Sequence, residues 1–221
     1  VCPTWFSRFE LLMTHKMFRG ACLFGPRGTG KTTTVRQLAA KHQQRVVVFQ
    51  CAGGMMIDDL LGVRDVRKGD SFLTPGPLTC AVRDDVWLVL EEANNLNPST
   101  YASLNTLTDG SGTPLRTKDG RVYYTGDKFR VVLCYNEGST YHGTREVNAA
   151  LKDRLRPIYC PYMDSISEES LIVSRTGCDR ATAANVVSLA NGCRKSRRAT
   201  GFDFSPRTAF VMLEFKRNLL C

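Results

Sequence analysis

The sequence predicts an α/β domain with a parallel sheet, followed by a smaller helical region. Five short, almost continuously apolar segments recur before residue 161, which is typical of strands that helices bury on both faces. Helix-like stretches lie between these segments. After Cys160 the strand signals stop and the sequence reads as helix.

The predicted strands are residues 21–24, 46–49, 86–90, 130–135 and 157–160. A helix is predicted over 32–41, and another begins at Asn97-Pro98, an N-cap followed by proline at the first helical position. Residues 62–77 are rich in Gly, Pro and charge and predict a loop or small hairpin. Residues 115–124 carry Asp119-Gly120 between segments able to pair, which predicts a hairpin.

The C-terminal part is predicted to hold helices at 166–175, 180–191 and 206–220, with Asp179 and Ser205 as N-caps. We place a domain boundary near Pro161, so that residues 1–160 form the α/β domain and residues 161–221 the helical one. The chain has 221 residues, 43% of them hydrophobic, which is long enough for one large core and a small satellite domain.

Composition excludes several classes of protein. No apolar run approaches the roughly 18 residues that a membrane span needs, and no basic segment precedes an apolar block at the N-terminus. The nine cysteines contain no C-x-x-C pair, so we expect small buried hydrophobes rather than zinc ligands or disulfides. These features predict a cytoplasmic protein, and the abrupt start at Val1 suggests a trimmed sequence.

The strongest motif is "GPRGTGKT", which fits G-x-x-x-x-G-K-[ST] and lies between a predicted strand and a predicted helix. Its glycines let backbone N–H groups face phosphates, and the following helix N-terminus favours anions. Lys31 would reach the β- and γ-phosphates, and Thr32 would offer its hydroxyl to Mg²⁺. The predicted ATP-binding residues are Gly25, Pro26, Arg27, Gly28, Thr29, Gly30, Lys31, Thr32 and Thr33.

A second motif is the buried strand that ends in Glu91 and Glu92, about 60 residues after Lys31. One carboxylate can hold the Mg²⁺ shell, and the next can polarise an attacking water. Adjacent acids can also be an ordinary solvated strand end, but their distance from the P-loop favours function. Thr32 and Glu91 are the predicted metal ligands.

Three further residues are candidates for the reaction. Asn136 ends another buried strand, where a neutral amide can orient water or contact the γ-phosphate, although a turn-forming Asn before Gly138 is the alternative. Arg154, with Arg156 nearby, ends a predicted helix and has the side chain that stabilises charge on a transferred phosphoryl group. Arg207 begins the last predicted helix, where a cation is unfavourable unless an anion lies close.

The net charge of +9 keeps nucleic acid open as a partner. The charges are spread widely, however, and the one dense run is Arg194, Lys195, Arg197 and Arg198. Such a run is more often a solvated face, so nucleic-acid binding is not favoured.

In order and approximate spacing, these motifs resemble the AAA+ ATPases of the MoxR group. "DLLG" at 59–62, "TPGPLTCAVRDD" at 74–85, "CYNEG" at 134–138 and "LKDRLRPIYCPYMDSISEE" at 151–169 resemble the branch that contains CbbQ and NorQ, activators of rubisco and of nitric-oxide reductase. The resemblance covers nearly the whole chain.

The resemblance implies a five-stranded parallel sheet in order 5-1-4-3-2 with a helical lid from about Pro161. It implies a hexameric ring with ATP at each interface, where Arg154 acts on the neighbour's γ-phosphate and Arg207 couples the lid to nucleotide. Residues 62–77 and 115–124 would face the pore or a protein client. MoxR proteins typically work with a partner that carries a von Willebrand factor A domain.

One position departs from the family pattern, which usually has Asp where this chain has Glu91. The extra methylene shifts the carboxylate, so slower hydrolysis is one expectation. The sequence therefore predicts an ATP-driven remodeller of a protein complex, with two alternatives: a nucleic-acid motor or loader, and an ATP-gated scaffold with weak hydrolysis.

Overall fold

The computed structural model describes residues 2–67, 70–136, 147–196 and 204–219. The chain divides into two compact units. The main unit consists of Trp5–Gly25 and Lys31–Tyr159, and the helical unit of Val1–Thr4, Pro26–Gly30 and Cys160–Cys221. The functional division into domains 1–160 and 161–221 stays a prediction.

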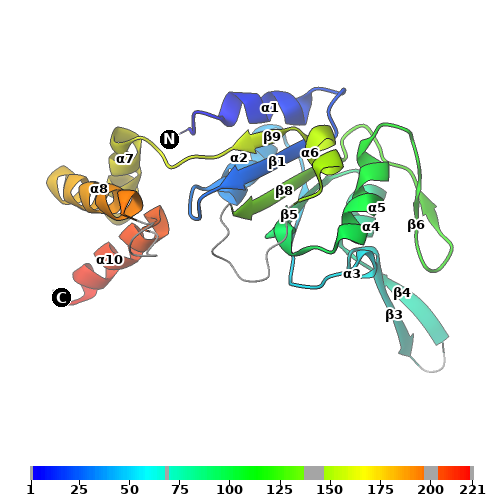
Figure 1. Cartoon of the computed structure of the whole chain (residues 1–221). Coiled ribbons are helices and arrows are strands. Elements are labelled where there is room, and N and C mark those ends of the chain that lie inside the picture. Colours follow the sequence, from blue (N-terminus) through cyan, green and yellow to red (C-terminus); the bar gives the residue numbers. More distant parts are fainter. Residues whose placement is uncertain (1, 68–69, 137–146, 197–203, 220–221) are drawn as a thin grey trace. The chain divides into compact units, whose positions relative to one another are not determined.

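The main unit is built on five parallel strands in the order β2-β5-β8-β1-β9 (Figure 1). Counted along the chain and read from the other edge, this is the predicted order 5-1-4-3-2. All five predicted segments are strands: β1 (Gly20–Gly25), β2 (Val46–Gln50), β5 (Trp87–Glu91), β8 (Arg130–Asn136) and β9 (Pro157–Tyr159).

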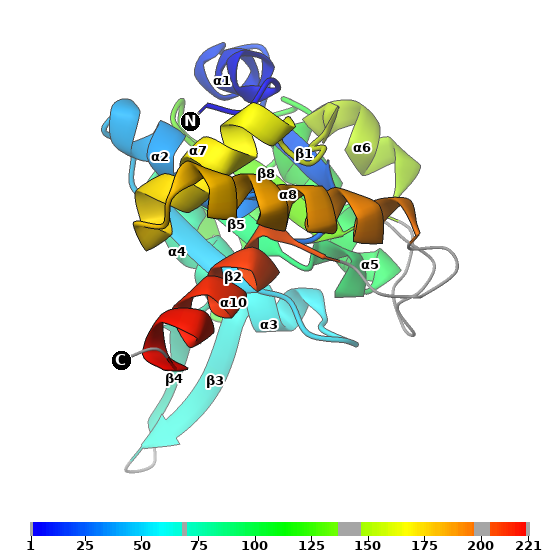
Figure 2. The same cartoon turned by 90° about the vertical axis from the view of Figure 1, so that its left-hand side faces the viewer.

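Helices cover both faces of this sheet because alternate strand residues point to opposite sides. In Figure 2, α1 (Phe6–Thr14) and α2 (Lys31–Lys41) lie on one side of the strands, and α5 (Pro98–Thr108) and α6 (Ala149–Leu155) on the other. Cys22 belongs to the core under α5 and α6, together with residues of α3 (Ile57–Leu61) and α4 (Pro77–Arg83). Helix α1 was not predicted.

The two interruptions of the α/β alternation are both hairpins, as predicted. Strand β3 (Gly62–Arg67) pairs antiparallel with β4 (Asp70–Pro75), and β6 (Leu115–Arg116) with β7 (Val122–Tyr123). Glycine is required at Gly62, where φ is +133° and a Cβ would lie 2.3 Å from the carbonyl oxygen of Thr74. Lys118 ties the second hairpin to α3, because its Nζ lies 2.8 Å from Asp58 Oδ2.

Helix α5 begins at Pro98 with Asn97 at the N-cap position, as predicted. Its side chain makes no cap hydrogen bond to the helix. Instead, Asn97 Nδ2 donates to the carbonyl oxygen of Gly54 at 2.9 Å. The amide therefore ties the start of α5 to the segment after β2.

The helical unit contains α7 (Ser165–Thr176), α8 (Arg180–Lys195) and α10 (Pro206–Leu219). Helices α7 and α8 lie side by side in Figures 1 and 2. Asp179 caps α8 as predicted, since its carboxylate accepts from the N–H of Thr182, and Ser205 Oγ accepts from the N–H of Thr208 at the start of α10. A small core lies between the helices, formed by Ile172, Ala183, Val187, Ala190, Phe204, Ala209 and Leu213.

The basic run after residue 193 is not a uniform solvated face. Arg194 forms a buried ion pair with Glu168, whereas Lys195 is exposed. The sequence interpretation was wrong for Arg194 because it could not show that Glu168 on α7 faces it. Arg197 and Arg198 lie outside the described residues.

Four of the described cysteines, Cys22, Cys51, Cys134 and Cys160, are buried as predicted. Cys2 is exposed, and Cys80, Cys178 and Cys193 are half-buried. Burial raises the pKa of the Cys22 thiol to about 11 and that of Cys51 to about 12, so these thiols act as small apolar groups. Within the described residues, no helix is long and apolar enough to cross a membrane.

Candidate nucleotide-binding site

The site lies where three parallel strands end at the same edge of the sheet. Register pairs Gly25 of β1 with Asn136 of β8, and Glu91 of β5 with Cys134 of β8. The strand order places β8 between β1 and β5. Ligands of open parallel sheets bind at this carboxyl edge, and the polar residues predicted from the sequence gather there.

The P-loop connects β1 to α2 through a turn that needs glycine. Gly28 and Gly30 have φ of +74° and +81°, a left-handed conformation that turns backbone N–H groups toward a common centre. A Cβ at Gly30 would meet nothing within 4 Å, so glycine serves conformation there rather than space. Thr29 is buried and its hydroxyl donates to the Pro26 carbonyl.

Lys31 begins α2 and is held close to the strand ends. Its side chain is buried, and Nζ donates to the carbonyl oxygen of Gly25 at 3.1 Å and to Asn136 Oδ1 at 3.1 Å. The loop curls back on itself through the first bond. The second bond brings the P-loop lysine and the strand-end asparagine together, as the sequence predicted.

Asn136 also contacts the acidic strand end. Its Nδ2 donates to Glu92 Oε1 at 2.8 Å, so one amide accepts from a cation and donates to an anion. We call these three residues the Lys31–Asn136–Glu92 group. The amide of Asn136 thus connects the P-loop lysine with the acidic strand end.

The two glutamates have different backbone conformations. Glu91 is the last residue of β5 and half-buried, and its carbonyl accepts from the N–H of Cys51 at 2.8 Å. Glu92 has φ of 50° and ψ of 40°, which is left-handed and unfavourable for a residue with a Cβ. This turn ends the strand and redirects the chain into the 3₁₀ turn η1 (Ala93–Asn95).

Two residues beside this turn were missed by the sequence analysis. Asn94 is 3% exposed and its Oδ1 has no hydrogen-bond partner among the described residues. A buried unpaired acceptor costs roughly 1–3 kcal/mol. Tyr101 of α5 reaches back to the turn with its hydroxyl. A signal for Asn94 was available, because polar residues directly after an acidic strand end are candidates for the same edge.

Arg154 does not belong to the Lys31–Asn136–Glu92 group. It lies in the last turn of α6, and its Nη1 donates to the Ala150 carbonyl at 3.0 Å. Its charge also contributes, after the hydroxyl of Ser111, to lowering the pKa of Asp109. Arg156 is exposed and lies 3.3 Å from Asp153.

The remaining predicted residues lie as follows. Thr32 is half-buried and Thr33 exposed in the first turn of α2, and Arg27 is exposed. Arg207 is exposed in the first turn of α10 and belongs to the helical unit. A role for Arg207 beside the nucleotide therefore stays a prediction.

The donor set suits magnesium and phosphate. The hydroxyl of Thr32 and the carboxylate of Glu91 are hard oxygen ligands, and Mg²⁺ binds through one or two such groups together with phosphate oxygens. Within the described residues, no group of three His, Cys, Asp or Glu side chains could hold a metal ion.

Comparison with known proteins assigns the family. Residues 20–155 match the AAA domain of the dynein-related subfamily. The chain belongs to this family. The chain is 27% identical to the protein CbbQ of Hydrogenophilus thermoluteolus over 214 residues, which is 97% of this chain and 78% of CbbQ. It is 26% identical to the protein NorQ of Paracoccus denitrificans over 173 residues, or 78% of this chain and 63% of NorQ.

Two further proteins are similar to this chain. An uncharacterised protein of Bacillus subtilis, YojN, is 26% identical over 172 residues, which is 76% of this chain and 56% of YojN. A solved structure titled a "putative ATPase" of Cytophaga hutchinsonii superposes with a TM-score of 0.60 and 21% identity, over 81% of this chain and 54% of that one. The chain thus spans little more than half of several proteins that it matches.

The AAA assignment confirms the resemblance drawn from the motifs, including the CbbQ and NorQ branch. It also confirms the predicted fold class and, at the level of the family, the expectation of an ATPase. The match covers the P-loop, both glutamates, Asn136 and Arg154, but it does not test the role of any of them.

Proposed function

We propose that this AAA domain binds ATP with Mg²⁺ and hydrolyses it, in order to remodel or activate a partner protein. The observation that carries the proposal is the Lys31–Asn136–Glu92 group. It brings a buried cation and a carboxylate to one sheet edge through a shared amide. A triphosphate with its attacking water requires both.

In this proposal each strand end has one task. Lys31 binds the β- and γ-phosphates, and the backbone of residues 25–30 surrounds them. Glu92 is the general base that takes a proton from the attacking water, and Asn136 orients that water and Glu92. Thr32 and Glu91 hold Mg²⁺, which would neutralise charge on the phosphates.

We further propose that the active form is a ring, in which Arg154 acts on the nucleotide of the neighbouring subunit. The contacts of Arg154 support this, because it bonds to its own helix and faces Asp109 rather than Lys31 or Glu92. Arg207 would contact the nucleotide of its own subunit and couple the helical unit to it. A hexamer is the stoichiometry that the family suggests.

The partner is proposed to be a protein complex, reached directly or through an adaptor with a von Willebrand factor A domain. Similarity to CbbQ and NorQ supports this class of client. A cytoplasmic location is also part of the proposal, and the free buried thiols agree with a reducing compartment.

The structure weakens the nucleic-acid alternative at one residue of the dense basic run. Arg194, the first residue of that run, forms an ion pair with Glu168 and is therefore not available to bind phosphates. The scaffold alternative rests on Glu91 in place of Asp. Phosphate release by the assembled protein separates a scaffold from a motor, and retention on DNA that depends on ATP would instead support a nucleic-acid role.

The Lys31→Ala variant tests nucleotide binding. It removes the cation proposed to face the phosphates, so we expect tight ATP binding to be lost in a fluorescent-nucleotide titration. Arg36→Ala is a matched control, since it removes an exposed cation of α2 outside the P-loop, and it should retain most of the affinity. Wild-type affinity of Lys31→Ala would contradict the P-loop assignment.

A further inference from the structure

The backbone of Glu92 is held in a conformation that it would not adopt alone. Its left-handed φ and ψ follow directly after the extended residues of β5. Such a conformation persists only where the surroundings fix it. It also decides where the carboxylate points, because a return to extended backbone would turn the side chain away from its present direction.

Local backbone bonds support the turn from one side. The N–H of Asn95 donates to the Glu92 carbonyl at 2.9 Å, and that of Leu96 to the Ala93 carbonyl at 3.1 Å. The side chain of Asn95 donates to the Cys51 carbonyl at 3.3 Å. These contacts come from the turn itself and from the segment that follows β2.

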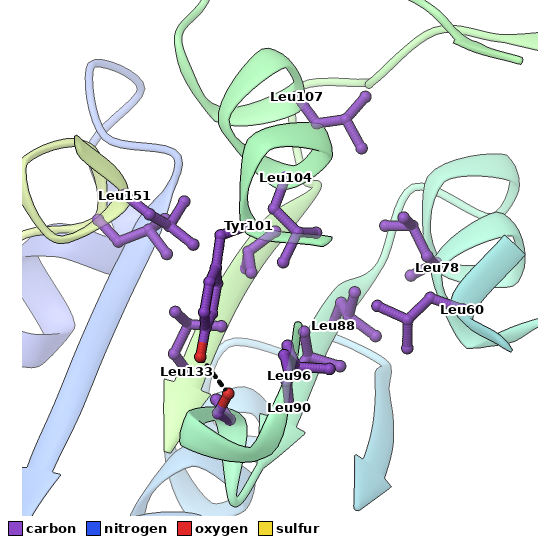
Figure 3. Close-up of a cluster of buried hydrophobic side chains, with 14 of the residues drawn as sticks. Leu60, Leu78, Leu88, Leu90, Leu96, Tyr101, Leu104, Leu107, Leu133 and Leu151 are labelled. Atoms are coloured by element: carbon purple, nitrogen blue, oxygen red, sulfur yellow. Dashed lines mark hydrogen bonds between the residues drawn. The ribbon is translucent and has the colours of Figure 1, made fainter. Parts of the chain in front are cut away.

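Tyr101 supports the turn from a different element. Its hydroxyl donates to the carbonyl oxygen of Ala93, the residue after Glu92, at 2.6 Å (Figure 3). Both Tyr101 and Ala93 are fully buried, at 1% and 0% exposure. A short hydrogen bond in an environment without water is stronger than one at the surface, so this carbonyl is firmly placed.

The ring that carries this hydroxyl is itself fixed by packing. Figure 3 shows Tyr101 standing among core leucines, with its hydroxyl directed at the turn below α5. The ring would pack equally well without its oxygen, as phenylalanine. The hydroxyl therefore adds a connection between the core of α5 and the backbone that carries Glu92. The neighbouring leucines labelled in the figure include Leu96, Leu104, Leu133 and Leu151.

We propose that Tyr101 is a positioning residue for ATP hydrolysis. By fixing the Ala93 carbonyl, it holds Glu92 in the left-handed conformation from which Oε1 meets Asn136 Nδ2. Tyr101 acts through Glu92 and does not touch the substrate. The inference rests on the proposed role of Glu92 as the base.

The test is Tyr101→Phe, which removes the hydroxyl and keeps the ring. We expect kcat to fall about tenfold, below the 10²-fold that a misplacement of 1 Å can cost, with KM and ATP affinity unchanged within about twofold. In a Glu92→Gln background, single-turnover hydrolysis should show no further loss from Tyr101→Phe. A residue that acts only through Glu92 has nothing left to position there.

Thr79→Val is the matched control. Thr79 is 1% exposed, and its hydroxyl donates to the Leu61 carbonyl at 2.7 Å, so this change also removes one buried hydroxyl bond in the main unit. We expect it to lower thermal stability as much as Tyr101→Phe does while leaving kcat unchanged. An equal fall in kcat would show that Tyr101→Phe acts through general stability, and would overturn the proposal.

The remaining outcomes separate the role of Tyr101 from the role of Glu92. An unchanged kcat in Tyr101→Phe, or an equal loss in the wild-type and Glu92→Gln backgrounds, overturns the role of Tyr101 and leaves that of Glu92 intact. Near-normal turnover of Glu92→Gln by itself overturns the role of Glu92 and with it this inference. Loss in the wild-type background alone supports both.

Discussion

Charged side chains are bonded in two different ways in the two units of this chain. In the helical unit, Arg194 places both terminal nitrogens on the two oxygens of Glu168, each at 2.7 Å. Its Nε donates to the Phe204 carbonyl, and its guanidinium lies 3.9 Å from the centre of the Tyr162 ring. In the main unit, Lys31 and Glu92 are both bonded to the neutral amide of Asn136.

The difference separates a structural role from a functional one. In the Arg194–Glu168 pair each charge is answered by its opposite, with aromatic stacking in addition, so it joins α7, α8 and the start of α10. In the Lys31–Asn136–Glu92 group a neutral amide links the two charged side chains, which suits the proposed action of both on a ligand. The number of buried charges therefore says little about function, and the identity of their partners says much.

The largest expected effect tests whether a second subunit completes the site around the Lys31–Asn136–Glu92 group. Arg154→Ala should lower ATP hydrolysis by about 10³-fold or more, the scale of arginines that act in trans on related P-loop enzymes. Binding of ATP to an isolated subunit should stay nearly unchanged. Steady-state phosphate release and nucleotide titration measure the two quantities.

A mixing experiment gives the in-trans signature. Arg154→Ala and Glu92→Gln subunits are each expected to be nearly inactive, but an interface between them combines intact Glu92 with intact Arg154, so activity should partly return. The same mixture with Arg156→Ala tests whether this neighbouring arginine, which pairs with Asp153 at the surface, takes the role instead. No recovery with either arginine, in assemblies shown to be mixed, would contradict a shared site.

The next effect tests the Arg194–Glu168 ion pair of the helical unit. Glu168→Gln leaves the buried guanidinium of Arg194 without its counter-charge, and we expect a loss of about 3–5 kcal/mol in the stability of the helical unit. Hydrogen exchange of peptides from α7 and α8 measures it. Both tryptophans, Trp5 and Trp87, lie in the main unit. The denaturation curve followed by tryptophan fluorescence should therefore be nearly the same for Glu168→Gln as for the wild type.

Replacing both partners sharpens this test. The double variant Glu168→Leu with Arg194→Met removes both charges and should regain most of the lost stability, since apolar substitutes for a buried ion pair are often neutral or stabilising. If the double variant is as unstable as Glu168→Gln, the Arg194–Glu168 pair contributes more to stability than the neutralisation of its two charges. No comparable recovery of activity is expected when both charges of the Lys31–Asn136–Glu92 group are removed, because these charges are proposed to act on the substrate.

A smaller effect concerns the amide between the charges. Asn136→Ala should lower kcat by about 10²-fold, the scale of a displaced catalytic group, with little change in the denaturation of the main unit. Asn97→Ala is the matched control, since that amide also donates a side-chain bond in the main unit, to Gly54. Equal losses of kcat in the two variants would argue against a special role for Asn136.

The smallest effect concerns pH and the helical unit. The pKa of Asp179 is lowered, first by the N–H of Thr182 and then by its hydroxyl, so its capping contribution is present above the ordinary Asp pKa of about 3.9 and is lost as the pH falls further. Asp179→Ala should lower the melting temperature of the helical unit at neutral pH. The difference in melting temperature between this variant and the wild type should become smaller at acid pH. Asp179→Asn keeps the acceptor and should show no such pH dependence.

The sequence by itself determined where the strands lie and which residues are candidates for the site. Continuous apolar runs mark strands buried on both faces, and the P-loop and acidic strand end have local patterns that need no tertiary information. Even the two hairpins were signalled by Gly, Pro and Asp-Gly. The family motifs then supplied the strand order, since it is a property of the whole chain that no local pattern contains.

Only the tertiary structure decided which charges meet. Arg194 looked like part of a solvated run, because Glu168 lies 26 residues earlier in the sequence and on another helix. The N-cap position of Asn97 could be predicted, but the bond of its side chain to the Gly54 carbonyl could not, since Gly54 comes from elsewhere in the fold. The left-handed turn at Glu92 and the hydroxyl of Tyr101 that faces it left no trace in the sequence. Strain and its support arise from packing between distant segments, which periodicity and spacing do not record.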